Sequence, residues 1–291
     1  MWLQCATAYN LSSGPIQSRA ADLARFQLQS PVRYVESTMI LINDHGMVRE
    51  VRLNRPPVNA LIAELLVTLR EAIQAAPRDG VRALILSGAP GRFSAGLDVP
   101  LLLGSDRAAM AVLWRELYAL LHALAASPIP IAAALTGHAP AGGTVLALFC
   151  DWRVMAQEDY KLGLNEVQVG IPLPPVLLGA LRRLVGSRQA ERLAVSGILI
   201  SPQEALRVGL VDDVAAMDQV IARALDWCQR MVALPSEAML ATRRTARADL
   251  LHLFEVNLEP EIQRVIENWW SPSTQSTLRA LVERMGKKAS S

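Results

Sequence analysis

The sequence predicts an α/β fold with a mostly parallel sheet, crossover helices and a helical C-terminal region. From about residue 39 to residue 173, short apolar runs alternate with longer segments of helical spacing. Such alternation is typical of a parallel sheet whose strands are connected by helices. After residue 173 only the helical spacing continues. A chain of 291 residues that is 52% hydrophobic and 19% charged can bury one large core.

The elements before residue 173 begin with a predicted β-hairpin. Residues 39–42 are apolar, residues 47–53 contain valines between charged residues, and the Asn-Asp-His-Gly sequence between the two segments favours a turn. Helical spacing follows in two long segments, and a short apolar segment predicts a buried helix. These helices are predicted at 61–75, 108–126 and 142–149, and the other strands at 81–87, 130–135, 152–156 and 160–164.

The region after residue 173 is predicted to contain helices only. The clearest helix start is Ser201-Pro202-Gln203-Glu204, with serine at the N-cap and proline at the first helical position. Trp269 and Trp270 look exposed and suit a subunit contact, although burial in the core explains them equally well. The predicted helices are 173–185, 188–196, 202–208, 217–232, 236–250, 254–270 and 273–285.

Three regions are therefore expected along the chain. Residues 1–38 form an N-terminal extension, 39–200 an αβ core, and 201–291 a helical C-terminal region. The extension contains three arginines, only two acidic residues and several serines, a composition that weakly resembles an organelle transit peptide. A poorly ordered extension, or an upstream start codon before Met39, explains it better. We expect a cytoplasmic protein, with the mitochondrial matrix as the alternative.

Composition argues against several classes of function. The 29 basic and 27 acidic residues are distributed along the chain, whereas a nucleic-acid-binding protein more often has a concentrated basic stripe. The cysteines and histidines are widely spaced, which predicts free thiols and no metal site. They are Cys5, Cys150, Cys228, His45, His122, His138 and His252.

Residues 128–150 contain no charged residue over a length that could cross a bilayer. Prolines and glycines interrupt this segment, so it is interpreted as the buried centre of a soluble α/β fold, and no membrane partner is expected.

Two glycine-containing turns and one carboxylate carry the functional signal. The sequences RFSAGLD (92–98) and GHAPAGG (137–143) each follow a predicted strand and can present backbone N–H groups, so two facing turns would form an oxyanion hole. In GLNEVQVGIP (163–172), Glu166 lies among apolar residues, where desolvation raises its pKa and suits proton transfer. Taken singly, the turns are explained by close packing and Glu166 by a solvated strand end. Together they indicate an enzyme that moves a proton next to a carbonyl.

These motifs resemble those of the crotonase (enoyl-CoA hydratase/isomerase) superfamily, from about residue 39 to residue 285. Within it, the chain looks most like the mitochondrial-type Δ3,Δ2-enoyl-CoA isomerases. The resemblance implies a crotonase-like ββα spiral core, an acyl-CoA thioester substrate with no cofactor beyond the coenzyme A of that substrate, and a homotrimer or a dimer of trimers. It is carried by RPPVNAL (55–61), FSAGLD (93–98), PAGG (140–143), Cys150-Asp151 and GLNE (163–166).

The resemblance also implies roles for single residues. The N–H groups of Ala95 and Gly142 would hold the thioester oxygen, and Glu166 would carry a proton from C2 to C4. Residues 57–60 would border the coenzyme A, and Asp98 is expected to fix its turn through an Asx-type contact. The implied substrate-binding residues are Ala95, Gly96, Leu97, Asp98, Val99, Gly142 and Asn165.

Other side chains have two interpretations each. His138 could line the site, although a surface or satisfied core position is commoner for such a histidine. Lys287 and Lys288 could meet coenzyme A phosphates or form a frayed basic tail. Six leucines could wall an acyl pocket or belong to the core: Leu101, Leu102, Leu103, Leu173, Leu177 and Leu178.

Val145 is the position that discriminates between reactions. The resemblance implies that hydratases have a second glutamate there, three residues after the oxyanion glycine, to position water. An apolar residue favours isomerisation of 3-enoyl-CoA to trans-2-enoyl-CoA, as in β-oxidation of fatty acids. The alternatives are another acyl-CoA enzyme (a hydratase, decarboxylase or thioesterase) and a non-catalytic crotonase-like binding protein.

Overall fold

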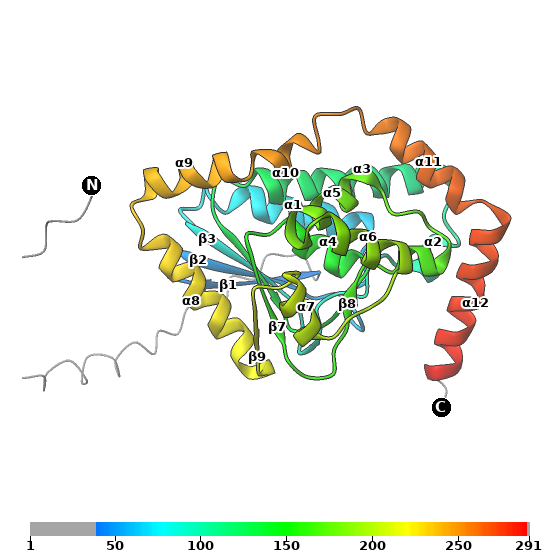
Figure 1. Ribbon diagram of the computed structural model, residues 1–291, viewed down its shortest axis with the longest axis horizontal. Coiled ribbons are helices and arrows are strands. Elements are labelled where there is room, and N and C mark those ends of the chain that lie inside the picture. Colours follow the sequence, from blue (N-terminus) through cyan, green and yellow to red (C-terminus); the bar gives the residue numbers. More distant parts are fainter. Residues whose placement is uncertain (1–38, 290–291) are drawn as a thin grey trace, which may run out of the picture. The chain divides into compact units, whose positions relative to one another are not determined.

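Two sheets organise residues 39–289, the part of the chain that the computed structural model describes, with side chains up to residue 284 (Figure 1). The larger has the order β1-β2-β3-β5-β7-β9 and the smaller β4-β6-β8. Among the named strands of the described residues, all pairs are parallel except the antiparallel pair β1 and β2. The strands are β1 (Ile40–His45), β2 (Val48–Leu53), β3 (Ala83–Ser87), β4 (Gly91–Arg92), β5 (Ile131–Leu135), β6 (Gly137–Pro140), β7 (Trp152–Ala156), β8 (Leu162–Gly163) and β9 (Asp213–Ala215).

The predicted hairpin is confirmed. Strands β1 and β2 pair from Ile40 opposite Leu53 to His45 opposite Val48. The connection between them contains Gly46 at φ 67°, a backbone conformation that glycine adopts without steric cost.

The central strands β3 and β5 of the larger sheet are buried on both faces, which explains why they are almost continuously apolar. On β3, Leu84 and Leu86 belong to the core that includes the helices α1 (Ala63–Ala75) and α3 (Arg107–Ala126). The alternate residues of that strand, with Ala132 and Ala134 of β5, pack against α8 (Val220–Val232). The predicted crossover architecture is therefore confirmed.

The remaining helices include most of the predicted C-terminal region. They are α2 (Val99–Leu102), α4 (Gly142–Leu148), α5 (Pro175–Val185), α6 (Ser187–Ser196), α7 (Pro202–Val208), α9 (Ser236–Ala246), α10 (Ala248–His252), α11 (Glu259–Trp269) and α12 (Pro272–Ala289), with the 3-10 turns η2 (Glu166–Val169) and η3 (Met217–Gln219).

A buried ionic cluster fastens the later helices to the core. The Asp151 carboxylate, just before β7, accepts hydrogen bonds from Arg243 of α9 at 2.8 Å and from Arg247 at 3.0 Å. Arg247 also donates to the Phe149 carbonyl at 2.8 Å. Since a buried charge without a partner is costly, this network explains an acidic residue at the end of an apolar segment.

The expectation that no strand follows residue 173 is wrong. Strand β9 pairs parallel with β7 at the edge of the larger sheet. It is only three residues long, too short to produce an alternating pattern. The second sheet was also absent from the prediction, because β6 contains a glycine and a proline and its sequence resembles a turn.

Two predicted C-terminal helices are shorter than expected. The segment 236–250 is divided into α9 and α10, and the last segment before Trp270 becomes helical only at Glu259, next to Pro260. Trp269 is 1% exposed and belongs to the core, whereas Trp270 is half-buried with the Arg107 guanidinium 5.0 Å from its ring centre. The exposed interpretation of Trp269 is therefore wrong.

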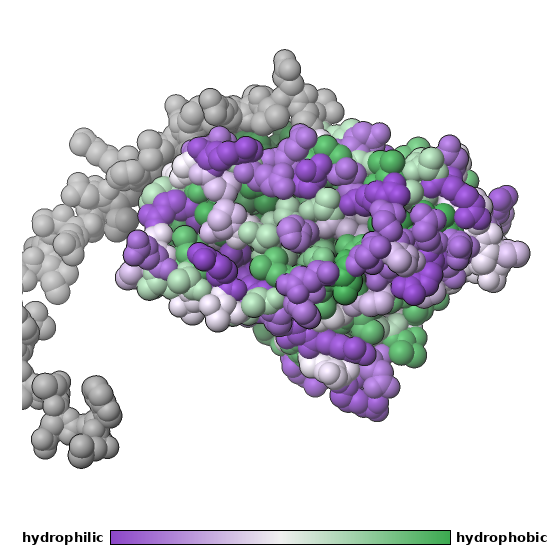
Figure 2. Space-filling view, turned by 90° about the horizontal axis from the view of Figure 1, so that it is seen from above, coloured by the Kyte–Doolittle hydropathy of each residue, from purple (hydrophilic) through white to green (hydrophobic). Residues whose placement is uncertain are grey.

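Helix α3 is long and apolar enough to cross a membrane, by length and composition alone. About 61% of its apolar window is buried inside the protein, where α3 packs against α1 and α11. Hydrophilic and hydrophobic residues are interspersed over the face seen in Figure 2. The segment 128–150 forms β5, β6 and α4, as the buried-centre interpretation predicts.

Some expectations lie outside this description. Residues 1–38, including Cys5, are beyond the described range, and so are the side chains of Lys287 and Lys288. The division at residue 200 stays a prediction. Cys150 and Cys228 are free and buried.

Candidate active site

The first glycine turn, between β4 and α2, is held by Asn59. The Asn59 side chain donates to the Phe93 carbonyl at 3.0 Å, and the Ser94 hydroxyl donates to the Asn59 carbonyl at 2.7 Å. The Ser94 hydroxyl also accepts from the N–H of Gly96 at 3.2 Å. Asn59 is 3% exposed, so it acts as a buried support for the turn, whereas Pro57 in the same segment is exposed.

The structure corrects the prediction that Ala95 supplies an oxyanion donor. The Ala95 N–H donates to the Val58 carbonyl at 3.0 Å, so it is already used. Two residues on, the Leu97 N–H has no acceptor among residues 39–289. The β-bridge between Leu61 and Leu97 is formed by the neighbours of Leu97. The Leu61 N–H donates to the Gly96 carbonyl, and the Asp98 N–H donates to the Leu61 carbonyl. Leu97 therefore replaces Ala95 as the candidate donor.

The second candidate donor is the N–H of Gly142, the first residue of α4, which also has no acceptor in the described part of the chain. A Cβ built on Gly96 would lie 2.9 Å from the Gly142 nitrogen, and one built on Gly142 would lie 3.0 Å from the Gly96 Cα. Because Leu97 follows Gly96 directly, the two free N–H groups lie in adjoining backbone segments. Two such donors can stabilise an oxyanion.

Thr144 connects α4 to both neighbouring strands of the smaller sheet. Its hydroxyl donates to the Ala139 carbonyl at 2.6 Å and accepts from the Gly163 N–H at 2.8 Å. The Ala141 N–H also donates to the Gly163 carbonyl at 2.8 Å. These bonds fix the start of α4 against β8, the strand that leads to Glu166. The role of Thr144 was not predicted from the sequence. The available signal was a single hydroxyl side chain within an apolar segment.

Glu166 begins η2, and its carboxylate oxygen Oε2 is buried although the residue as a whole is partly exposed. Its Oε2 atom has no hydrogen-bond partner among the described residues, and neither has Oδ1 of Asn165. Desolvation raises the pKa of Glu166 from 4.5 to about 7, and a hydrogen bond from its own backbone opposes the rise. A carboxyl group with a pKa near neutrality can both accept and return a proton at physiological pH.

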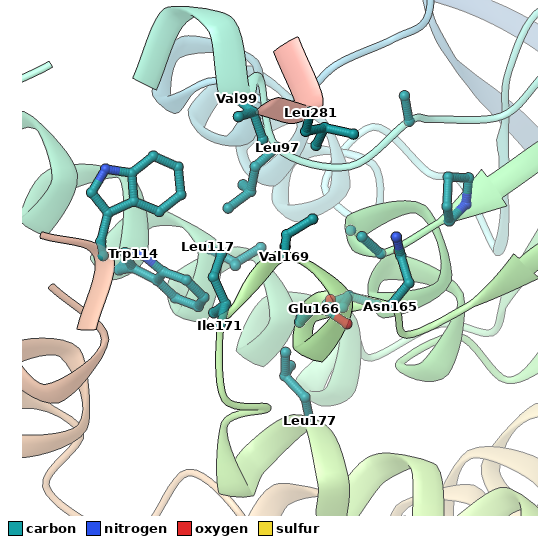
Figure 3. A pocket seen from close by; sticks show the side chains of 16 residues that line it. Leu97, Val99, Trp114, Leu117, Asn165, Glu166, Val169, Ile171, Leu177 and Leu281 are labelled. Carbon is teal, nitrogen blue, oxygen red and sulfur yellow. The ribbon is translucent and has the colours of Figure 1, made fainter. Parts of the chain in front are cut away.

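Glu166 faces an apolar cavity of about 240 Å³. Figure 3 shows it beside Asn165, with Leu97, Val99 and Leu281 on the opposite side. Among the described residues that line the cavity, Glu166 is the only ionisable one. The lining also includes Ala95, Trp114, Leu117, Pro140, Ala141, Gly142, Val145, Val169, Ile171, Leu177 and Trp269.

Several predicted site residues lie elsewhere. Gly96 shapes the turn without lining the cavity. The Asp98 carboxylate caps α2 by accepting from the Leu101 N–H at 3.1 Å, which confirms the Asx-type role, and it pairs with Arg55 at 2.7 Å. His138 is exposed beside the Tyr160 ring, so the surface interpretation holds.

Of the six candidate leucines, only Leu177 lines the cavity, and Leu101 is 52% exposed. Sequence reasoning missed Trp114, Trp269 and Leu281. Their apolar helical spacing is the same as that of ordinary core residues.

Comparison with known proteins identifies the family. The model for enoyl-CoA hydratase/isomerase matches residues 43–285. The chain belongs to this family. The structure of human mitochondrial delta3-delta2-enoyl-CoA isomerase superposes with a TM-score of 0.82 at 33% identity, covering 86% of this chain and 99% of that one. The crotonase fold is therefore shown.

Relatives within the enoyl-CoA hydratase/isomerase family carry two kinds of name. Enoyl-CoA delta isomerase 1, mitochondrial, of Mus musculus is 33% identical over 91% of this chain and 94% of its own length. Probable enoyl-CoA hydratase echA17 of Mycolicibacterium paratuberculosis is 35% identical over 74% of this chain and 84% of its own. The names of the relatives therefore do not distinguish isomerisation from hydration, and the distinction depends on the residues of the site.

Proposed function

We propose that the protein is an enoyl-CoA isomerase that shifts the double bond of a 3-enoyl-CoA to the trans-2 position. One observation carries this proposal: Glu166 is the only ionisable side chain lining a described apolar cavity that also contains Leu97 and Gly142. The likeness to proteins named enoyl-CoA delta isomerase supports it. The coenzyme A of the substrate is the only cofactor that this reaction needs.

The reaction uses Glu166 as a proton carrier. The Glu166 carboxylate removes a proton from C2, and the electron pair of that C–H bond moves toward the thioester oxygen to form a dienolate. The N–H groups of Leu97 and Gly142 stabilise the negative oxygen. The protonated Glu166 then donates the same proton to C4, and the double bond forms between C2 and C3. No atom is gained or lost.

Hydration is the competing reaction, since relatives named probable enoyl-CoA hydratases are also similar. It requires a water molecule held and activated beside C3. Val145 lines the cavity where the hydratase pattern has a second glutamate, and it is 2% exposed. An apolar side chain cannot hydrogen-bond such a water, which favours isomerisation.

A comparison of two substrates tests the proposal. Purified protein is incubated with 3-hexenoyl-CoA and, separately, with crotonyl-CoA, and the products are separated by chromatography. We expect conversion to 2-hexenoyl-CoA to be much faster than hydration of crotonyl-CoA. Equal or faster hydration would contradict the isomerase assignment and leave the family unchanged. Assembly into trimers or dimers of trimers remains part of the proposal and is tested by sedimentation.

A further inference from the structure

The turn that carries Glu166 contributes little to its own stability. Turn η2 spans only four residues, none of them buried, and has no side-chain cap. It ends at Gly170, whose φ of 82° reverses the chain. Just after the turn, the Ile171 N–H donates to the Glu166 carbonyl at 3.0 Å. Because short 3-10 turns are marginal, neighbouring elements must hold η2 in place.

One neighbour is the end of α6. A Cβ built on Gly197 would lie 2.6 Å from Cγ2 of Val167, so the backbone of Gly197 packs directly on η2. This contact is made by carbon atoms and is not a hydrogen bond.

The other neighbour is the first turn of α12. The Thr274 hydroxyl donates to the Gly170 carbonyl at 2.9 Å and accepts from the Ser271 hydroxyl at 2.9 Å. Thr274 is 1% exposed, and a Cβ built on Gly170 would lie 3.2 Å from its Oγ1. The buried hydroxyl thus has both a donor and an acceptor partner, on a surface where glycine permits close contact.

The same helix reaches the cavity. Leu281, further along α12, lines the cavity beside Val99, and α12 also contacts α2 (Figure 3). Helix α12 therefore touches both the turn that carries Glu166 and the segment that follows the Leu97 amide.

We propose that Thr274 is a positioning residue for Glu166: its hydroxyl fixes the Gly170 carbonyl and so ties η2 to α12, the helix that places Leu281 at the cavity. This inference rests on the proposed function of Glu166 as the proton carrier. Thr274 touches no substrate and acts only through the turn. The position of the Glu166 carboxylate therefore depends on the packing of α12 against η2.

Steady-state kinetics with 3-hexenoyl-CoA test this role. Thr274→Val keeps the shape and removes the donor, so kcat should fall about tenfold or more, as expected for a displaced catalytic group, while KM changes little. Thr274→Ser keeps the hydroxyl and should remain within about twofold of wild type. Thr277→Val is the matched control, because the Thr277 hydroxyl donates only to the Ser273 carbonyl of its own helix.

The pH dependence of kcat gives a readout that lost stability alone would not move. Burial governs the pKa of Glu166, and no charged side chain on the described parts of α4, α5, α6 or α12 contributes to it. A loosened turn admits water, so the acidic limb of the profile should move to lower pH in Thr274→Val and return in Thr274→Ser.

Hydrogen exchange tests the contact between Thr274 and η2 without a measurement of enzyme activity. The Ile171 N–H should exchange faster in Thr274→Val than in wild type or Thr277→Val. The inference would be overturned if Thr274→Val had the kcat, the pH profile and the exchange rate of the wild type. It would also be overturned if Thr277→Val lost as much kcat as Thr274→Val. If Thr274→Val does not fold, Thr274→Ala, which leaves room for water, takes its place with the same outcomes. Absence of isomerisation by the wild type would instead refute the proposed function. The exchange result would still show whether Thr274 holds η2 against α12.

Discussion

Gly96 and Gly142 approach so closely that neither position has room for a side chain. A Cβ on Gly96 would lie 2.9 Å from the Gly142 nitrogen, and a Cβ on Gly142 would lie 2.7 Å from Cδ1 of Leu61. This contact brings the first turn against the start of α4. The candidate oxyanion hole therefore depends on two glycines from separate motifs.

Substitution of Gly96 by alanine should damage catalysis. The new methyl group would push against the Gly142 N–H at a position where φ is 85°, so the two donors should separate. We expect kcat to fall by ~10²-fold or more, the usual loss when an oxyanion donor is misplaced. Gly104→Ala is the control, because its Cβ would meet nothing closer than 3.5 Å. A folded Gly96→Ala enzyme with full activity would exclude this oxyanion assignment.

Glu166→Gln should abolish most of the turnover and leave acyl-CoA binding intact. Loss of a general base costs ~10²-fold or more, and the amide keeps the size of the side chain. Binding is measured by calorimetry with a non-reactive acyl-CoA. The exposed Glu237 at the start of α9 provides the control variant Glu237→Gln. Near-wild-type turnover in Glu166→Gln would remove this carboxylate from the mechanism.

The activity should fall as the pH drops through about 7, because Glu166 must be ionised to accept a proton and burial raises its pKa to about 7. A pH–rate profile of kcat/KM checks this. An acidic limb near pH 4.5 would show instead that the carboxyl is solvated.

Stability should change in the opposite direction. The folded protein holds this proton more tightly than the unfolded chain, so Glu166 destabilises the fold as the pH rises from 4.5 to about 7. The loss is about 3 kcal/mol at most. Glu166→Gln should therefore raise the melting temperature at pH 8 and have little effect at pH 4. An equal shift at both pH values would contradict the raised pKa.

Val145→Glu should increase the fraction of hydration. The new carboxyl would line the cavity and could hold a water, although the gain should be modest because no surrounding group was selected to orient it. Products from crotonyl-CoA are quantified for both proteins. Unchanged hydration in a folded variant would mean that Val145 does not set the choice of reaction.

The cavity should limit the length of the acyl chain. Its volume is about 240 Å³, and Trp114 and Leu117 of α3 form part of its wall. Trp114→Phe removes part of the wall and should shift the preferred substrate to longer chains, measured as kcat/KM over C6 to C12 3-enoyl-CoA thioesters. Trp227→Phe is the control, since Trp227 stacks on Trp152 away from the cavity. If both variants preferred the same chain length, Trp114 would not determine the chain-length preference.

The sequence by itself determined the features that depend on local chemistry. The parallel α/β core followed from short apolar strands alternating with amphipathic helices. Glu166 and Gly142 could be identified because each lies in a short motif whose neighbours are small or apolar. The Asx-type cap of Asp98 is local in the same sense, since it joins residues three positions apart.

Only the tertiary structure decided what depends on partners distant in sequence. Whether a backbone N–H is free cannot be read from its own motif: the Ala95 N–H is used by Val58, and the Leu97 N–H is left without an acceptor in the described chain. Trp114 and Trp269 line one cavity although they belong to different helices. Each has the periodicity of an ordinary core residue, and only the packing of α3 against α11 brings both to Glu166.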